Sequence, residues 1–519
     1  MILLKGKIKN AFDSLVVTGK ADKPIYIHMK EGQASVKDAT HLWGKDIYET
    51  QEILKKELGK EISVACIGKA GENQVAYACV MNDEGRAAGR CGFGALMGSK
   101  NLKAVVCEGK QKVTVASKET ISALNKDAIP ALKGNVIGMA LNEFGTAMYT
   151  MAGMALGDVP SHYFTKSVFP AEKIDGLAMR TKYDVSNYFC QGCVVGCGRV
   201  LKDVAPDLPK VDGPEYETIA ALGPLCGNVD LESIIRANHL CNLHGIDTIS
   251  AGVSIAYAMY LYDKGVINEE TTGLSLKWGD ENAILKLLKM IIDNDGFGKL
   301  VGRGTLAMAR ELGRDEGEAA QVKGLEIPMH DPRAFAGQAI CYATGPRGAC
   351  HLKGDYVMVD SGMPVEEYGV IPGDRFATDR KKVESAVKFQ AYKELFNSLA
   401  MCIMAPVPPA LACGYLNAVT GWDITPDALL QTGMRSLAIK RVISNIMGMD
   451  ANQDTLPTIA NTALTEGSTA GVTYPIEEMV QTYYEIMGWD TATGRPGKEK
   501  LIELGLENLS DTLCNSTKS

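Results

Sequence analysis

Three cysteines within eight residues constrain this chain more than any other feature of its sequence. Cys190, Cys193 and Cys197 stand in the segment YFCQGCVVGCG. Their thiolates can converge only where the backbone turns tightly, and the glycines between them permit such turns. Ligation by thiolates alone favours an iron–sulfur cluster, although zinc also accepts four cysteines and three buried free thiols are a further interpretation. A fourth ligand must come from elsewhere in the chain.

The remaining cysteines are mostly scattered singly along a sequence that has 14 in total. The first residues lack the apolar core of a secretory signal, so a disulfide framework is not expected. We therefore expect small buried hydrophobic side chains at these positions. They are Cys66, Cys79, Cys91, Cys107, Cys226, Cys241, Cys341, Cys413 and Cys514.

Composition narrows the classes of function. A formal net charge of −8 over 519 residues, with no block of lysine and arginine, argues against a nucleic-acid partner. The longest apolar stretch, Ile249–Tyr262, is too short to cross a bilayer. We therefore expect a cytoplasmic protein with several domains and no membrane span.

The first 110 or so residues are predicted to be β-rich. Short apolar runs separated by turn residues predict strands at Leu15–Val17, Pro24–His28, Ile62–Ile67, Gln74–Val80 and Leu102–Val106. One helix is expected over Lys45–Leu58, and a glycine-rich loop over Gly85–Gly98.

From about Lys118 the pattern becomes helical. Asp230 can cap a helix that runs through Leu240, Gly245 interrupts it, and a second helix is expected from Ser250 to Gly265. A later helix has Thr425 as its N-cap, Pro426 in its first turn and apolar spacing through Ile446.

The predicted fold class is α+β and multidomain. A partial β-rich base domain over residues 1–112 is followed by two mainly helical domains, over 113–325 and 326–519. The stretch Ile327–Gly337, rich in proline and glycine, suggests the second boundary.

A short internal echo links two predicted helix ends. Asn242 to Asp247 reads NLHGID, and Asn397 to Cys402 reads NSLAMC, both of the form N-x-x-small-apolar-D/C. Six loosely matching residues are weak by themselves. The echo nevertheless places a cysteine, Cys402, at a position equivalent to Asp247.

Several segments together resemble the aldehyde ferredoxin oxidoreductase family, in order and over nearly the whole chain. They are the cysteine run, Gly89–Ala104 (GRCGFGALMGSKNLKA), the two echoing loops, Gly213–Thr218 (GPEYET), Arg347–Leu352 (RGACHL) and Gly488–Asp490 (GWD). The family has a β-rich base domain and two helical domains, with a tungsten or molybdenum bis-pyranopterin where they meet. The resemblance therefore implies that fold and that cofactor.

The resemblance also implies site residues. Cys402 becomes the fourth ligand of a [4Fe–4S] cluster, beside Cys190, Cys193 and Cys197. A Mg²⁺ ion is expected to bridge the pterin phosphates, with the Ala95 carbonyl as a ligand. The residues expected to bind the cofactor are Gly92, Gly94, Ala95, Asn242, Gly245, Ile246, Asp247, Asn397, Ala400 and Met401.

The implied activity is oxidation of an aldehyde to a carboxylic acid, with electrons passing through the cluster to ferredoxin or an iron–sulfur partner subunit. Glu217, or else Glu215, is the candidate general base, and His351 is the candidate donor to the developing carbonyl oxygen. Two alternatives stay open: the catalytic subunit of a class II benzoyl-coenzyme A reductase, and a pterin-free iron–sulfur electron carrier.

The chain also departs from the family pattern. Asn242 and Asn397 replace the usual aspartates, and Ala400 replaces a usual glycine. Arg236-Ala-Asn-His239 stands where some relatives have Glu-x-x-His for an iron between subunits, so no such iron is expected. The chain begins partway into the base domain, which predicts a truncated start or a second polypeptide, and either a homodimer or a complex. The sequence does not choose between tungsten and molybdenum, nor name the aldehyde.

Overall fold

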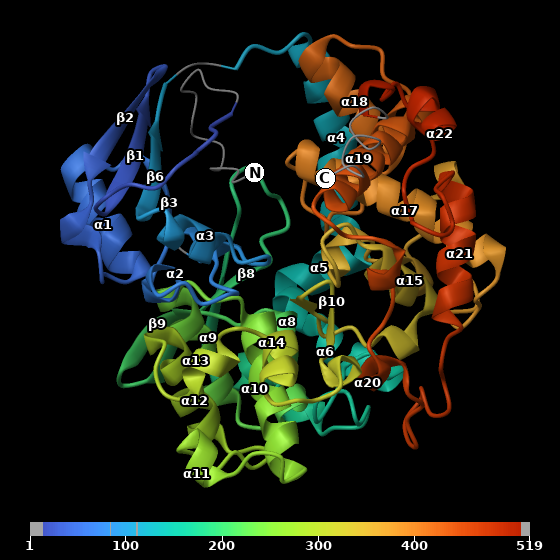
Figure 1. The fold of residues 1–519 in the computed structure, drawn as a ribbon. Helices are drawn as coiled ribbons and strands as arrows, with labels where there is room; N and C mark the ends of the chain where they lie inside the picture. The colour runs from blue at the N-terminus through green and yellow to red at the C-terminus, as the bar shows by residue number, and fades with distance from the viewer. Residues whose placement is uncertain (1–13, 84, 111–112, 510–519) are drawn as a thin grey trace.

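The N-terminal region is built on one six-stranded sheet, at the left of Figure 1 in the computed structural model, which describes residues 14–83, 85–110 and 113–509. Its strands lie in the order β2-β1-β6-β3-β4-β5. Neighbours are antiparallel except β1 and β6, which are parallel. The strands are β1 (Ile25–Lys30), β2 (Gln33–Asp38), β3 (Ser63–Cys66), β4 (Val80–Asn82), β5 (Arg86–Ala88) and β6 (Leu102–Glu108).

The two faces of this sheet bury alternate residues of the same strands, as the two-residue period of a strand requires. Val64 of β3 and Val106 of β6 pack with α1 (Ile47–Leu58) on one face. Ala65 and Val105 pack on the opposite face with Met97 of α3 (Phe93–Ser99). The sheet is therefore an open layer with α1 on one face and α3 on the other.

Sequence expectations for this region are confirmed in part. The helix over Lys45–Leu58 is present as α1, with Asp46 and Glu49 forming a reciprocal capping box. The strand expected at Leu15–Val17 is wrong: the run pairs with no described strand and Val16 is 82% exposed, although Val17 packs against one face of the sheet. β2 was not expected, since its mostly exposed residues carry no apolar alternation. The predicted Gln74–Val80 strand is real only at Val80, and the expected glycine-rich loop contains β5 and α3.

The rest of the chain is mostly helical, which confirms the predicted fold class (Figure 1). Its longer helices are α4 (Lys118–Gly134), α5 (Val136–Phe144), α6 (Tyr149–Leu156), α7 (Gly176–Lys182), α8 (Tyr216–Leu222), α9 (Leu231–His244), α10 (Thr248–Asp263), α12 (Glu281–Asp293), α14 (Thr305–Glu311), α15 (Ala336–Thr344), α17 (Arg380–Ser398), α18 (Pro409–Thr420), α19 (Pro426–Ile446), α21 (Ile476–Met487) and α22 (Lys498–Glu503). Short helices are α2 (Lys69–Glu72), α11 (Glu269–Thr272), α13 (Gly298–Val301), α16 (Val357–Asp360) and α20 (Thr458–Asn461).

The predicted helix ends are accurate where capping residues mark them. The Asp230 side chain accepts a hydrogen bond from Ser233 N at the start of α9, and Gly245 ends that helix in a left-handed conformation. Thr425 caps α19 by accepting from Ala428 N. The second of the paired helices begins two residues earlier than predicted, because Asp247 caps α10 at Thr248.

A small antiparallel sheet interrupts the helices and was not predicted. It consists of β7 (Asp184–Tyr188), β8 (Gly198–Ala205) and β9 (Leu208–Asp212). The β7–β8 connection is the segment that carries the three clustered cysteines. A two-stranded ribbon, β10 (Gln321–Val322) and β11 (Leu325–Glu326), was not predicted either.

Helix α4 packs against α18, so residues early in the helical part contact the last third of the chain. Tyr415 Oη donates to Asn125 Oδ1 at 2.7 Å, and Ser117 N donates to the Ala418 carbonyl at 2.9 Å. The proposed division near residue 325 stays a prediction. Within residues 14–83, 85–110 and 113–509, no helix is long and apolar enough to cross a membrane.

Candidate functional site

The cysteine loop between β7 and β8 is folded by its own backbone and by α5. Cys193 N donates to the Cys190 carbonyl at 3.0 Å, and Gly192 and Gly196 adopt left-handed conformations with φ of 73° and 71°. Asn142 of α5 donates to the Val195 carbonyl at 2.6 Å. The sequence therefore forms the tight turns that a cluster-binding loop requires.

Cys402 lies beside this loop, although the two are far apart in sequence. Burial raises the pKa of the Cys402 thiol, and negative charge on Cys193 and Cys190 raises it further. Burial likewise raises the pKa of Cys197 to about 11, with contributions from Glu215 and Cys402. Among the described residues, no group of three or more His, Cys, Asp or Glu side chains is arranged to hold a metal ion. The four thiols are thus neighbours without a coordinating geometry.

One cation from the N-terminal sheet faces the cysteines. The Arg86 guanidinium lies 4.7 Å from the centre of the Tyr188 ring. Burial opposes its charge, but Tyr188, Cys190 and Glu215 outweigh burial and raise the pKa of Arg86. Its Nη2 is buried without a hydrogen-bond partner among the described residues. This position suits an anionic group held by the thiolates.

The internal echo corresponds to two helix ends with the same closure. After α9, Gly245 has φ 71° and Ile246 N donates to the Cys241 carbonyl at 3.0 Å. After α17, Ala400 has φ 55° and Met401 N donates to the Phe396 carbonyl at 2.9 Å. The Asn397 side chain is exposed at the second loop. The echo in the sequence therefore corresponds to the same backbone turn at two helix ends, and its role in binding a cofactor stays a prediction.

Ala400 is expected to limit stability, because a left-handed conformation costs an alanine roughly 1–2 kcal/mol. Ala400→Gly should raise stability by about 0.5–1 kcal/mol after the larger backbone entropy of glycine is subtracted. The matched control is Ala123→Gly, at an exposed position inside α4, which should lose about 1 kcal/mol. Thermal unfolding of both variants measures this difference, and equal destabilisation by both would contradict the strain at Ala400.

The glycine-rich segment is pressed against the backbone of residues 71–79. A Cβ atom on Gly94 would lie 2.5 Å from the Cys79 carbonyl oxygen, and one on Gly98 would lie 1.9 Å from that of Gly71. Gly92 has φ 66° and faces the Ala76 carbonyl. Packing alone therefore explains these glycines. Ala95, in α3, is partly buried against the main core, and a cofactor role for this segment stays a prediction.

Two arginines, Arg90, which is buried, and Arg347, which is half-buried, converge beside this segment. Arg90 Nε lies 3.2 Å from Asp247 Oδ2, and Arg90 Nη2 donates to the Glu326 carbonyl at 2.5 Å. Arg347 Nη2 donates to Cys350 Sγ at 2.7 Å. Neither Nε forms a hydrogen bond within the part of the chain that the structure describes. Asp247 already accepts from Ile249 N and Ser250 Oγ and lies in an ion pair with Arg90. Arg347 Nε, rather than this carboxylate, is therefore the group that can bind an additional ligand.

Glu217 lies at the buried centre of the candidate site. It belongs to the first turn of α8, yet its Oε2 accepts from Met329 N at 2.9 Å rather than from its own helix. Its Oε1 has no hydrogen-bond partner among the described residues. That oxygen lies 3.6 Å from His351 Nδ1 and 3.7 Å from His330 Nε2.

Burial raises the pKa of Glu217 and, together with nearby charges, lowers the pKa of His351. Burial raises the pKa of Glu217 to about 7, although His330 and the Met329 N–H lower it. Burial and the charges of His330, Arg90 and Arg347 hold the pKa of His351 well below its usual range. Glu217 therefore titrates near neutral pH beside an uncharged His351.

The two candidate carboxylates are separated. Glu215 Oε2 accepts from Thr146 Oγ1 at 2.5 Å and lies 3.5 Å from Arg199 Nη2. Its charge acts on Cys197 and Arg86, on the cysteine side of α8. The structure thus brings His351 together with Glu217 and not with Glu215.

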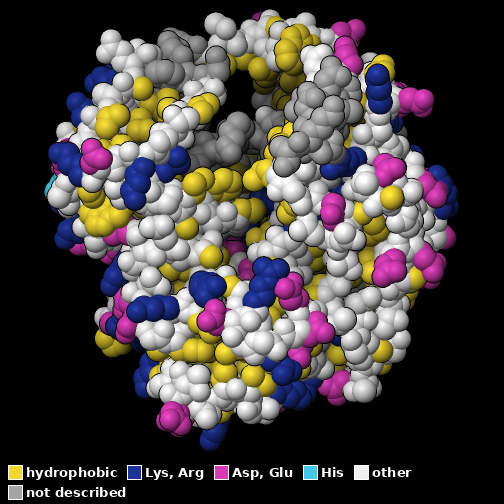
Figure 2. Space-filling view, viewed as in Figure 1, with side chains coloured by type: hydrophobic (Ala, Val, Ile, Leu, Met, Phe, Trp, Pro, Cys, Tyr) yellow, Lys and Arg dark blue, Asp and Glu magenta, His cyan; other side chains and the backbone are white. Residues whose placement is uncertain are grey.

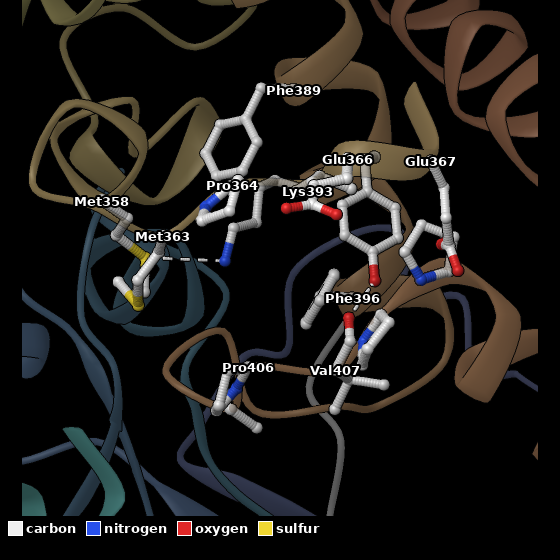
Figure 3. A pocket seen from close by; sticks show the side chains of 15 residues that line it. Met358, Met363, Pro364, Glu366, Glu367, Phe389, Lys393, Phe396, Pro406 and Val407 are labelled. Carbon is white, nitrogen blue, oxygen red and sulfur yellow. Dashed lines mark hydrogen bonds between the residues drawn. The ribbon is translucent and has the colours of Figure 1, made fainter. Parts of the chain in front are cut away.

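A cavity of about 280 Å³ lies behind the Cys402 loop (Figure 3). Phe389, Phe396 and Met358 line it, and Lys393 extends toward the Met358 sulfur while donating to the Ile403 carbonyl at 2.8 Å. None of the sequence-predicted site residues lines it, so it does not mark the reaction centre. A broader hollow opens between the N-terminal sheet and the C-terminal helices, with apolar side chains along its visible wall (Figure 2).

Comparison with known proteins identifies the family to which this chain belongs. The family model described as "Aldehyde ferredoxin oxidoreductase, domains 2 & 3" matches residues 123–506, and the N-terminal domain model of the same family matches residues 7–109. The chain belongs to the aldehyde ferredoxin oxidoreductase family. It is therefore an oxidoreductase.

The aldehyde ferredoxin oxidoreductases of two archaea illustrate the similarity. The tungsten-containing enzyme of Pyrococcus furiosus is 38% identical over 505 residues, covering 95% of this chain and 82% of the relative. That of Thermococcus kodakarensis is 37% identical with the same coverage. The active site complex BamBC of benzoyl coenzyme A reductase shares the fold, with a TM-score of 0.79 and 22% identity, covering 96% of this chain and 82% of that one.

The structure brings four further residues to the candidate site that were not predicted from the sequence. Arg90 belongs to the family motif Gly89–Ala104 and Arg347 to the motif Arg347–Leu352. An arginine beside glycines in a family motif could therefore have been recognised from the sequence as a candidate ligand-binding residue. His330 and Asp158 stand in no motif, and only the folded chain brings them to Glu217.

Proposed function

We propose that this chain oxidises an aldehyde and water to a carboxylic acid, releasing two electrons and two protons. The proposed cofactors are a tungsten bis-pyranopterin, with molybdenum as the other possible metal, a [4Fe–4S] cluster and a Mg²⁺ ion between the pterin phosphates. Electrons would leave to ferredoxin or to an iron–sulfur partner subunit. The observation that carries the proposal is the free Oε1 of Glu217, buried and facing neutral His351.

Unpaired arginine donors support the pterin part of the proposal. A buried N–H without a partner costs about 1–3 kcal/mol, so two such groups in one place favour an anionic ligand. Arg347 Nε is buried without a hydrogen-bond partner among the described residues, and Arg90 Nε, which lies 3.2 Å from Asp247 Oδ2, also forms no hydrogen bond within them. Arginine binds phosphate oxygens strongly. These two side chains would hold pterin phosphates, and the helix ends at Gly245 and Ala400 would bind the pterins.

The cysteine side supports the cluster. Three thiols of the β7–β8 connection lie near the thiol of Cys402, and two of these three, Cys190 and Cys197, also interact electrostatically with the Arg86 cation. Thiolate-rich sites of this kind suit iron–sulfur clusters. Cys190, Cys193, Cys197 and Cys402 would be the ligands.

When bound, the metal supplies a Lewis acid and a two-electron acceptor. The chain's own residues would manage oxygen and protons. Glu217 Oε1 and His351 Nδ1 are 3.6 Å apart, so a substrate oxygen to one side of this pair would lie within hydrogen-bond distance of both atoms. Glu217 would take the proton of the attacking water, and the neutral His351 would donate to the developing carbonyl oxygen.

The first test is elemental analysis of protein purified without oxygen from its native host. We expect about four irons for the cluster and one tungsten or molybdenum per chain. Iron without either heavy metal would contradict the pterin proposal and favour the electron-carrier alternative. With both metals present, assays of several aldehydes against ferredoxin reduction then test the reaction, and inactivity toward all of them would contradict it.

A further inference from the structure

Glu217 Oε1 lies between two histidines that differ in their surroundings. His351 Nδ1 and His330 Nε2 are 3.6 and 3.7 Å from this oxygen, and the two rings are 5.7 Å apart. His351 has Arg90 and Arg347 in its electrostatic surroundings. His330 instead has a carboxylate, Asp158, against its far nitrogen.

Asp158 fixes the His330 ring. His330 Nδ1 lies 2.5 Å from Asp158 Oδ2, and the Asp158 side chain is fully buried. Tyr149 Oη donates to the same Oδ2 at 2.9 Å, and Asp331 N donates to the Asp158 carbonyl at 2.7 Å. The rings of Tyr149 and Tyr216 flank the imidazole at 5.4 and 5.2 Å. The ring therefore has one orientation, with Nε2 directed at Glu217.

The residue before His330, Met329, is hydrogen-bonded to α8 through both its backbone N–H and its carbonyl. Met329 N donates to Glu217 Oε2 at 2.9 Å, and the Met329 carbonyl accepts from Tyr216 Oη at 2.5 Å. Glu217 thus has one oxygen fixed by backbone and the other directed toward the two imidazoles. A displacement of His330 would also move the oxygen that faces substrate.

The charges around His330 and Glu217 determine how far each of the two side chains is ionised. Burial favours a neutral imidazole, but Asp158 outweighs burial and raises the pKa of His330 to about 9. The other titratable or charged groups that face the pair are Asp355, Arg90 and Asp331, with the hydroxyls of Tyr149, Tyr216 and Tyr342. Among these, Asp355 strengthens the charge on His330, and Arg90 helps Glu217 to ionise.

We propose that His330, held by Asp158, is a positioning residue that keeps Glu217 anionic and oriented for proton abstraction. This rests on the proposed role of Glu217 as general base. Without the imidazolium, burial acts on the carboxyl with less opposition, and Glu217 holds its proton to higher pH. The loss is then greatest at low pH and is partly recovered as pH rises. A merely structural role for His330 would lower activity equally at every pH.

The test compares His330→Gln with the wild-type holoenzyme in the pH dependence of kcat/KM. We expect the acidic limb to move upward by about one pH unit or more, which is at least a tenfold loss on that limb. Asp158→Asn should move the limb in the same direction but by less. It removes the charge that keeps His330 protonated, and it also removes the Asp158 charge that itself raises the pKa of Glu217. His162→Gln is the matched control. His162 hydrogen-bonds Ser161, its pKa responds to burial, Lys166, Asp263 and Glu466, and we expect an unchanged limb.

Infrared titration of the Glu217 carboxyl provides a readout that needs no aldehyde. The difference between wild type and Glu217→Gln isolates its C=O band, and the same difference in the His330→Gln background should titrate at higher pH. An unmoved band, or a uniform loss at every pH, overturns the proposal. If the holoenzyme oxidises no aldehyde, the proposed function fails separately, and the band still decides the role of His330. Asp158→Asn serves as the second variant if His330→Gln does not fold.

Discussion

Glu217→Gln is expected to lower aldehyde turnover by about 10²–10⁴-fold, the usual contribution of a general base. The amide keeps the shape of the side chain and can still accept from Met329 N, so the fold and the metal content should be retained. It cannot take a proton from water. Steady-state kinetics and elemental analysis on the same preparation measure both halves of the expectation.

The wild-type rate and the rate of Glu217→Gln should depend differently on pH. The active form of Glu217 is the carboxylate, and burial raises its pKa to about 7. The wild-type rate should therefore rise as pH increases through about 7, and the residual rate of Glu217→Gln should lack that rise. Glu215→Gln is the matched control, two residues away on the cysteine side of α8, and should retain turnover within about tenfold. Full activity in Glu217→Gln, or loss only in Glu215→Gln, would reverse the assignment.

The parts of this fold that sequence could predict are those specified by local chemistry. Asp230, Gly245 and Thr425 mark helix ends through caps that act within one turn, and the structure has each of them. The small sheet β7–β9 was missed because its strands lack a regular alternation of buried and exposed residues: in β8, Lys202 and Asp203 are exposed one after the other where the pairing register shifts. The scattered cysteines are buried as expected, except Cys91, which is exposed, and Cys514, which lies outside the described residues.

The site divides in the same way. Cys190, Cys193 and Cys197 were visible from spacing, and Glu217 and His351 from family motifs. His330 and Asp158 became visible only through contacts between distant segments, since a single histidine before a proline-rich turn has no periodicity to report. The resemblance to the family identified Cys402, and the structure adds the physical reason. Helix α17 ends at Ser398 in the same turn as α9, and the chain after this turn brings Cys402 beside the cysteine loop.

Cys402→Ser should have the second large effect, on iron rather than on fold. A serine hydroxyl is a poor substitute for a thiolate in an iron–sulfur cluster. Cys402 follows the end of α17 and belongs to none of the hydrophobic clusters of the described residues, so the replacement removes little packing. We expect iron to fall well below four per chain, or the signal of the chemically reduced cluster to change, with ferredoxin-dependent turnover lost. Iron analysis and electron paramagnetic resonance of anaerobic protein make these measurements.

Cys413→Ser is the matched control, since it makes the same substitution in the next helix. Cys413 is buried in α18, and the pKa of its thiol responds to burial and to Glu367 but not to the other cysteines. We expect its iron content and cluster signal to equal those of the wild type. Unchanged iron and unchanged spectra in Cys402→Ser would show that the fourth ligand is another group. Loss of iron in both variants would mean that the damage is to the helical region rather than to a ligand, because only one of the two thiols faces Cys190 and Cys193.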